Sequence, residues 1–303
     1  MSVDLQPDPT AIGDVSTPPF AVLPDPATLF QVRAARLRTY ASVSPLKPYL
    51  DFVAGLVDAQ HEIVNALPPV EMPDGAALAR AASFGMPPLD RSRTTLDVTL
   101  EATLDAMFDA AARVAKPAEA AGALQRVTAA NAAYRAQMVR DVLDNALPVE
   151  TLAEHVYVAA ALQVHFARLA SRLDVEKLSP VGDGVCPVCG GPPVASLIVE
   201  WRNAHGNRFC VCSLCATLWN YVRIRCCSCG STKGIGYQEI DGSPGTVKAE
   251  TCDECRTYVK VMYQNKDVTI EAFADDVGTL ALDMMMRQGP YRRAAFNPFL
   301  LGY

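Results

Sequence analysis

The chain has 303 residues, of which 50% are hydrophobic and 20% are charged, and its formal net charge is −6. This length and apolar content allow a sizeable core and two domains of ordinary size. The acidic balance disfavours a nucleic-acid-binding protein, because such a protein needs a basic face.

The first residues carry no basic segment followed by an apolar one, so no secretory signal is expected. The most apolar run, 156–164, is far shorter than the roughly 20 residues that a membrane-spanning helix needs. We therefore expect a cytoplasmic protein without membrane insertion. In that reducing compartment, paired cysteines are more often metal ligands than disulfides.

Residues 1–26 are rich in Pro, Asp, Ser and Thr, which predicts a flexible arm. Helical periodicity then predicts an all-α domain over 27–180. Thr95 is expected to cap its fourth helix, and Thr151 with Glu154 fits a capping box at the start of its last helix. The predicted helices span 27–42, 50–67, 76–84, 95–108, one or two helices within 117–147, and 151–173.

This helical half has no cysteine and no phosphate-binding glycine motif. His61, His155 and His165 are isolated along the chain, and a catalytic site needs a converging constellation. These histidines therefore indicate helix packing or surface positions. The helical half shows no set of residues that predicts catalysis, and any function it has is expected to be binding.

All ten cysteines lie between Cys186 and Cys255. Eight of them form Cys-x-x-Cys pairs, and the first two pairs recur later in the chain with the same internal spacing. These eight are Cys186, Cys189, Cys212, Cys215, Cys226, Cys229, Cys252 and Cys255. The repeat predicts two consecutive modules, at 181–222 and 223–265, each built as a knuckle, a hairpin, a second knuckle and a strand. The predicted strands are 194–201, 208–211, 218–224, 236–240, 246–251 and 258–263.

Four thiolates in two Cys-x-x-Cys pairs can surround a tetrahedral ion. Sulfur ligands at about 2.3 Å suit Zn²⁺, and a four-sulfur site also suits a mononuclear iron centre. We therefore predict two metal ions, each bound by four cysteines. A complete set leaves no open position for a water nucleophile, so hydrolytic catalysis is disfavoured. Such a metal supplies folding free energy to a module too small to fold alone.

The short loops favour metal sharing within each module. A cross-brace, in which the first and third pairs share an ion, is the alternative. A thioredoxin-type redox pair would need a βαβ context, which the sequence lacks. Cys210 and Cys227 are left over and are expected to be buried or spectator thiols, with redox lability as the alternative. His205, in the first hairpin turn, is not expected to bind metal, because four cysteines already complete the site.

The four knuckles differ in the residue that follows their second cysteine. Gly190 and Gly230 stand there in the first knuckle of each module, where glycine permits positive φ. Ala216 and Arg256 occupy the same place in the second knuckles.

Residues 266–303 are predicted to form a C-terminal helix and tail. The helix is expected over 271–288, with Asp275 and Asp276 near its start, where carboxylates complement the helix dipole. Its predicted apolar stripe comprises Phe273, Val277, Leu280, Ala281 and Met284. The basic and aromatic tail is expected to dock on the body or on a partner.

Several motifs together resemble one known family, the formate dehydrogenase accessory protein FdhE family. They are Cys186-Pro-Val-Cys-Gly-Gly-Pro-Pro-Val-Ala-Ser, Cys-Ser-Leu-Cys at 212–215, Trp219-x-Tyr-Val-Arg-Ile-Arg-Cys226, Lys-Ala-Glu-Thr-Cys at 248–252, Ala274-Asp-Asp-x-x-x-Leu-Ala-Leu-Asp283, Asn297-Pro-Phe and Gly85-Met-Pro-Pro-Leu89. The chain departs from the family in its polar hairpin at 201–206 and its Pro-rich start.

The resemblance implies an α+β fold, in which an N-terminal all-α domain precedes two tandem rubredoxin-like or zinc-ribbon four-cysteine modules and a C-terminal helix. It implies a cytoplasmic maturation factor that is not an enzyme. Such a factor contacts the catalytic subunit of formate dehydrogenase, an iron-sulfur enzyme with molybdenum or tungsten. Iron is the metal attributed to the family's sites, with the eight paired cysteines as ligands. A rubredoxin-like electron carrier that acts during maturation is the alternative function.

Overall fold

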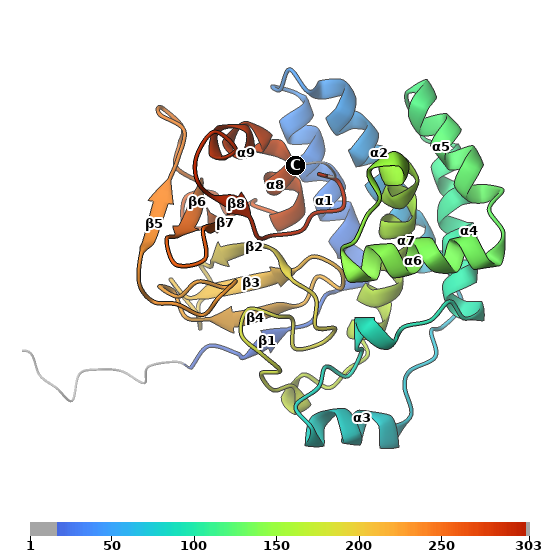
Figure 1. Cartoon of the computed structure of the whole chain (residues 1–303), viewed down its shortest axis with the longest axis horizontal. Helices are drawn as coiled ribbons and strands as arrows, with labels where there is room; N and C mark the ends of the chain where they lie inside the picture. Colours follow the sequence, from blue (N-terminus) through green and yellow to red (C-terminus); the bar gives the residue numbers. More distant parts are fainter. Residues whose placement is uncertain (1–16, 301–303) are drawn as a thin grey trace, which may run out of the picture.

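The computed structural model describes residues 17–300. One part is helical and the other is built on a single β-sheet, so the predicted α+β class is confirmed (Figure 1). The helices of the first part are α1 (Pro26–Ala41), α2 (Lys47–Ala66), α3 (Gly75–Ser83), α4 (Val98–Ala112), α5 (Ala118–Thr128), α6 (Ala132–Asp144) and α7 (Leu152–Ala170). Short 3₁₀ turns lie at Arg91–Arg93, Val149–Thr151 and Val175–Lys177.

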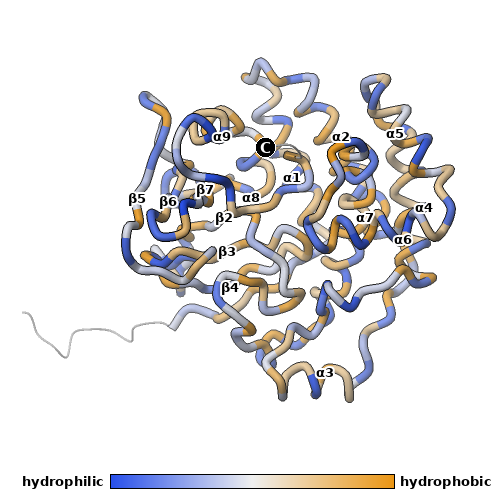
Figure 2. The backbone as a smooth tube through the Cα atoms, viewed as in Figure 1, coloured by the Kyte–Doolittle hydropathy of each residue, from blue (hydrophilic) through white to orange (hydrophobic). Residues whose placement is uncertain are grey.

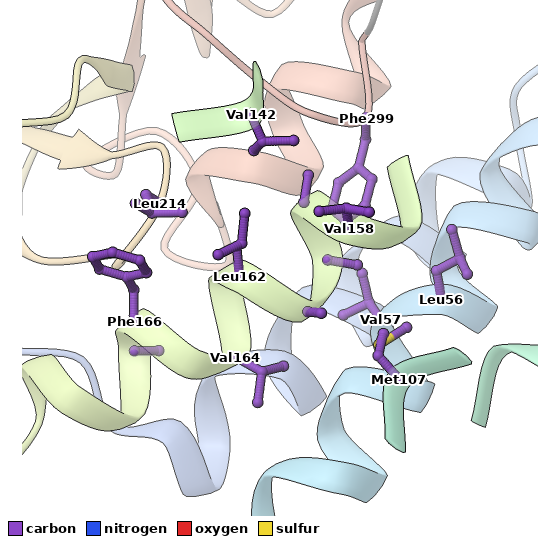
Figure 3. Packing of buried hydrophobic residues seen from close by; sticks show 14 of the residues in the cluster. Leu56, Val57, Met107, Val142, Val158, Leu162, Val164, Phe166, Leu214 and Phe299 are labelled. Carbon is purple, nitrogen blue, oxygen red and sulfur yellow. The ribbon is translucent and has the colours of Figure 1, made fainter. Parts of the chain in front are cut away.

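Helix α7 forms the centre of the helical part and is buried along most of its length. It is apolar around much of its circumference, as expected for a helix with neighbours on all sides. Figure 3 shows Leu162 and Phe166 of α7 in one cluster with Met107 of α4 and Leu214 of the sheet part. The surrounding helices are amphipathic, and apolar and polar segments alternate along them (Figure 2).

The predicted cap of α4 is wrong, whereas α7 begins directly after the predicted residue Thr151. Helix α4 begins at Val98, and its cap is Asp97, whose Oδ1 accepts hydrogen bonds from the amides of Thr99 (3.0 Å) and Leu100 (2.8 Å). The prediction placed the cap too early in the chain, at Thr95. Thr151 is the N-cap residue of α7, as predicted, but its hydroxyl makes no capping bond, so the predicted capping box is not formed.

The sheet has the order β1-β4-β3-β2-β7-β6-β5, with β8 also paired to β7. Its strands are β1 (Ala21–Val22), β2 (Pro193–Ile198), β3 (Arg208–Cys212), β4 (Leu218–Tyr221), β5 (Ile235–Gln238), β6 (Val247–Cys252), β7 (Thr257–Tyr263) and β8 (Arg292–Arg293). The six predicted strands are confirmed, with ends that shift by a few residues. Each module contributes an antiparallel meander, and the parallel pair β2–β7 joins the two meanders edge to edge.

Part of the predicted N-terminal arm belongs to this sheet. Ala21 and Val22 pair with Trp219 and Leu218 of β4, so the prediction of flexibility is wrong at these two residues. Pairing with an edge strand supplies backbone hydrogen bonds that composition alone does not reveal. Residues 1–16 of the predicted arm lie outside the described residues.

The predicted helix at 271–288 is two short helices, α8 (Ala272–Gly278) and α9 (Leu280–Met286), that break at Thr279. The buried Lys260 ammonium donates hydrogen bonds to the carbonyls of Asp276 (2.7 Å) and Thr279 (3.2 Å) at this break. The break turns Ala281 and Met284 towards solvent, so the predicted apolar stripe is wrong at both positions.

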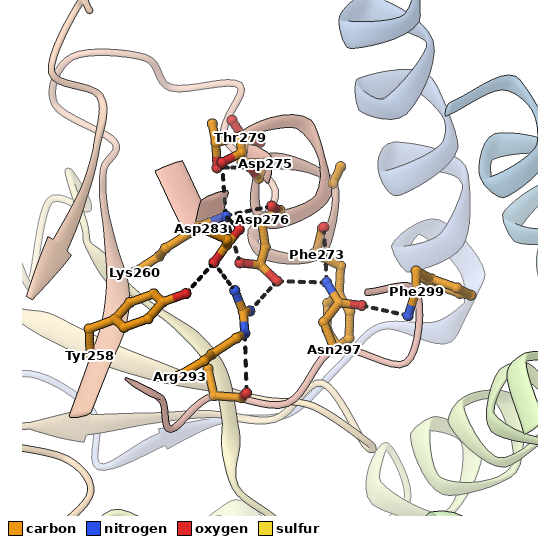
Figure 4. A network of polar contacts seen from close by, with 12 residues as sticks. Tyr258, Lys260, Phe273, Asp275, Asp276, Thr279, Asp283, Arg293, Asn297 and Phe299 are labelled. Carbon is orange, nitrogen blue, oxygen red and sulfur yellow. Dashed lines mark hydrogen bonds and ion pairs between the residues drawn. The ribbon is translucent and has the colours of Figure 1, made fainter. Parts of the chain in front are cut away.

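Asp275 and Asp276, which were predicted to complement the helix dipole, are buried together with Asp283 in an ion-pair network (Figure 4). Arg293 of β8 pairs with Asp276 (2.6 Å) and Asp283 (2.5 Å), and Lys260 pairs with Asp283 (2.5 Å). Asn297 donates a hydrogen bond to Asp276 over 2.8 Å. The motifs at 274–283 and 297–299 therefore meet in one structural clamp that holds the tail on the body.

Candidate metal centres

The structure gathers the eight paired cysteines into two clusters of four. One cluster is Cys186, Cys189, Cys212 and Cys215, and the other is Cys226, Cys229, Cys252 and Cys255. Within each cluster the four Sγ atoms all lie within 4.8 Å of one another. The clusters follow the modules, so the cross-braced arrangement is not formed.

The spacing of the sulfur atoms fits a tetrahedral ion. The Sγ–Sγ distances are 3.6 Å for Cys186–Cys215 and 3.4 Å for Cys189–Cys212 in the first cluster. The corresponding distances in the second cluster are both 3.7 Å. A tetrahedron with metal–sulfur bonds of about 2.3 Å has edges of about 3.8 Å. Both clusters can therefore hold Zn²⁺ or iron with little rearrangement.

All four knuckles share one backbone conformation after their second cysteine. Gly190 and Gly230 have a φ of 73°, and Ala216 and Arg256 have φ values of 59° and 56°. The amides of Gly190, Gly230 and Arg256 donate to the carbonyl of the first cysteine of their knuckle, each over 2.9 Å. The sequence indicates the positive φ only at Gly190 and Gly230, because Ala216 and Arg256 adopt the same φ without being glycine.

Backbone and hydroxyl groups around the sulfur atoms also repeat. The amides of Val188 and Ser228, which occupy equivalent positions in the two modules, point at Cys186 Sγ (3.4 Å) and Cys226 Sγ (3.3 Å). Cys215 Sγ donates to the hydroxyl of Thr217 over 3.2 Å, and the hydroxyl of Thr257 lies 3.0 Å from Cys255 Sγ. The backbone N–H groups and a donating Thr257 hydroxyl stabilise the thiolate, which is the form of cysteine that binds metal.

The thiols of the two clusters differ in acidity. Burial raises the pKa of the Cys186 thiol well above its ordinary value. At Cys255 burial also opposes ionisation, but the Thr257 hydroxyl and the neighbouring thiols outweigh it and lower the pKa to about 7. Metal binding requires deprotonated sulfur, so a bound cation would hold the remaining thiols as thiolates.

Cys210 and Cys227 belong to neither cluster, and both are buried, as predicted. A hydrogen bond between the two thiols lowers the pKa of Cys210 and raises that of Cys227. They lie beside the buried guanidinium of Arg208, which is attracted to both sulfur atoms. The sequence contains no signal for this contact, which depends on the two modules lying side by side.

None of the four histidines contributes to either cluster. The buried ring of His155 contacts the carbonyl of Thr151 and the carboxylate of Asp141. His165 is buried at the wall of a surface cavity of about 650 Å³, which the connector at 85–89 also lines. His205 lies in the hairpin turn at 201–206 and pairs with Glu200 over 2.8 Å. Among residues 17–300, no helix is long and apolar enough to cross a membrane.

The connector at 85–89 packs against the first cluster. The amide of Leu89 donates to the carbonyl of Val188 (2.9 Å), and the amide of Arg91 donates to the carbonyl of Cys189 (3.2 Å). At the other knuckle of this cluster, Gln163 of α7 donates to the carbonyl of Ser213 over 3.0 Å. The helical part therefore holds both knuckles of the first cluster.

Comparisons with known proteins agree with this architecture. Family models described as FdhE N-terminal, FdhE central domain and FdhE C-terminal domain match residues 18–183, 185–223 and 224–300. A protein FdhE homolog from Rhizobium meliloti (strain 1021) is 46% identical over 306 residues and covers 100% of both chains. Protein FdhE from Escherichia coli O9:H4 (strain HS) is 33% identical over 292 residues, which cover 93% of this chain and 91% of that protein.

The fold is also similar to a solved structure. The crystal structure of the FdhE protein from Pseudomonas aeruginosa superposes with a TM-score of 0.85 at 31% sequence identity. The match covers 94% of this chain and 99% of that chain. A match of this extent, together with three family models in order along the sequence, identifies the family. The chain belongs to the FdhE family.

Proposed function

We propose that the protein is an accessory factor for the assembly of active formate dehydrogenase and that it binds the catalytic subunit of that enzyme. The observation that carries the proposal is the pair of closed four-cysteine clusters within one sheet of an FdhE-family chain. A cluster with four sulfur ligands leaves no open position for a substrate or a water nucleophile. The protein then acts by binding and not as an enzyme.

The eight clustered cysteines would hold two metal ions, iron or zinc. A bound ion would fix the two knuckles of each module and so hold the shape of the surface that meets the partner. We place this activity in the cytoplasm, because that compartment is reducing and keeps cysteines from forming disulfides. The acidic charge of the chain, −6, supports a protein partner over a nucleic acid.

A rubredoxin-like electron carrier that acts during maturation is the second candidate. The exposed Cys229 favours it, because electron exchange needs a metal ligand close to the molecular surface. A reversible visible spectrum of a thiolate-bound iron site would support this function. A colourless, zinc-loaded protein from cells that still supports maturation would contradict it.

Deletion of the gene tests the proposed function. The deletion strain should lose formate oxidation, and the full-length protein supplied in trans should restore it. The tagged chain should also co-purify with the catalytic subunit of formate dehydrogenase. Full formate oxidation in the deletion strain would contradict the proposal.

A further inference from the structure

The two clusters share a backbone plan but differ in their exposure to solvent. All four cysteines of the first cluster are buried. In the second cluster Cys229 is exposed and Cys255 is partly exposed. Two sites with the same ligands therefore present different barriers to an outside molecule.

The residues between the cysteines show the same contrast. In the first cluster Val188 and Leu214 are buried and belong to the hydrophobic core of the helical part. At the equivalent positions of the second module, Ser228 and Glu254 stand in their places and are exposed. Ser228 and Glu254 therefore lie outside the hydrophobic core that covers Val188 and Leu214.

Contacts from the helical part seal the first cluster. The segment that follows α3 bonds to one knuckle through Leu89 and Arg91, and Gln163 of α7 bonds to the other. Beside the knuckle of Cys226 and Cys229 in the second cluster, Arg225 forms an ion pair with Asp183 over 2.8 Å. The Asp183 side chain is 55% exposed. Opening the first cluster thus requires separating packed elements, whereas Cys229 is reachable in the folded protein.

We propose that the second cluster is the site at which this protein exchanges its metal with outside thiols, while the first cluster retains its metal. The four cysteines of the second cluster would hold the ion, an incoming thiol would replace Cys229 as a ligand, and Cys229 Sγ would take up the proton that the incoming thiol gives up. No electron is transferred. This inference rests on the proposed metal binding and assigns different roles to the two sites.

Release of metal to a chelator tests the inference on the full chain. The zinc-loaded protein is mixed with excess 4-(2-pyridylazo)resorcinol, and the coloured complex is followed with time. We expect one zinc ion per chain to be released quickly and the other slowly, with rates that differ by at least about tenfold. Mass mapping after brief iodoacetamide treatment should find Cys229 and Cys255 labelled before any cysteine of the first cluster.

Variants assign the two phases. Cys229→Ser should abolish the fast phase and keep the slow one, whereas Cys210→Ser should keep both. Leu214→Ala, which opens the cover of the first cluster, should accelerate the slow phase only. If Cys229→Ser fails to fold, the labelling order in the unaltered protein decides the question.

Three results would overturn the inference. Release of both equivalents at one rate would show that the clusters are equally accessible, while the proposed assembly role would stand. Earlier labelling of Cys186 or Cys189 would reverse the assignment. A protein that binds no metal would overturn the inference together with the proposed metal sites.

Discussion

Arg208 of β3 and Glu250 of β6 form a buried ion pair between the two cysteine modules. The guanidinium contacts both carboxylate oxygens, over 2.8 and 3.1 Å, and the side chains are 0% and 4% exposed. Burial raises the pKa of Glu250, and the charge of Arg208 opposes this rise. The pair joins two meanders whose strands touch only at β2 and β7 among the described residues.

Glu250→Gln should destabilise the protein by about 3–5 kcal/mol, because it leaves the buried Arg208 charge without its partner. Urea unfolding of the metal-loaded protein measures this loss. Asp51→Asn, which removes the exposed pair with Lys47, is the control and should change stability by less than about 0.5 kcal/mol. Equal effects of the two changes would contradict the role given to Arg208.

Arg256→Gly should stabilise the protein by about 0.5–1 kcal/mol, since a non-glycine residue at a φ of 56° is strained. Gly230→Ala should have the opposite effect, because an added Cβ would lie 2.9 Å from Asp183 Oδ2 at a φ of 73°. Gly75→Ala at the start of α3 meets no neighbouring atom and serves as the control. Thermal unfolding of all three variants compares them. A loss of stability in Arg256→Gly would refute the strain argument.

Acid should destabilise the protein through His165. Burial lowers the pKa of His165 to about 4, although Asp97 opposes the shift. As the pH falls, the His165 ring is therefore protonated in the unfolded chain before it is protonated in the folded protein. Stability from the neutral ring is complete above the ordinary pKa of about 6.5 and is lost as the pH falls towards 4. The loss amounts to about 2 kcal/mol between pH 7.5 and pH 5. His165→Gln should remove that part of the acid slope in urea unfolding, and an unchanged slope would show that other groups cause it.

Asp97→Ala should destabilise α4 by about 1 kcal/mol, because two amides of its first turn lose their acceptor. Thr95→Ala, in the segment just before the cap, should leave stability nearly unchanged. Chemical unfolding at neutral pH distinguishes the two positions. The reverse order would restore Thr95 as the cap.

The clusters were predictable because metal ligation by Cys-x-x-Cys pairs is local, and the second module repeats the spacing of the first. The strands follow from runs such as 258–263, where β-forming residues dominate. The parallel pairing of β2 with β7 left no local signal, since it depends on contacts between residues far apart in the chain, such as Ser196 with Val261. The sequence therefore predicted two modules but not the single sheet that they form.

Long-range contacts also explain the errors. The pattern of 271–288 fits one helix, yet Lys260 of β7 binds carbonyls at the break. Asp275 and Asp276 look like surface residues of a helix start until Arg36 and Arg293 are placed beside them. The polar residues Ser228 and Glu254 in the second pair of knuckles are consistent with the exposure of the second cluster. What covers the first cluster depends on the position of α7, which the sequence does not reveal.

Counting bound metal by native mass spectrometry tests the central claim most directly. The anaerobically purified chain should carry two metal ions, one for each four-cysteine cluster. Cys252→Ser should carry one, and Cys210→Ser, which alters a thiol outside the clusters, should still carry two. A metal-free wild-type protein, or equal loss of metal in Cys210→Ser and Cys252→Ser, would contradict the account.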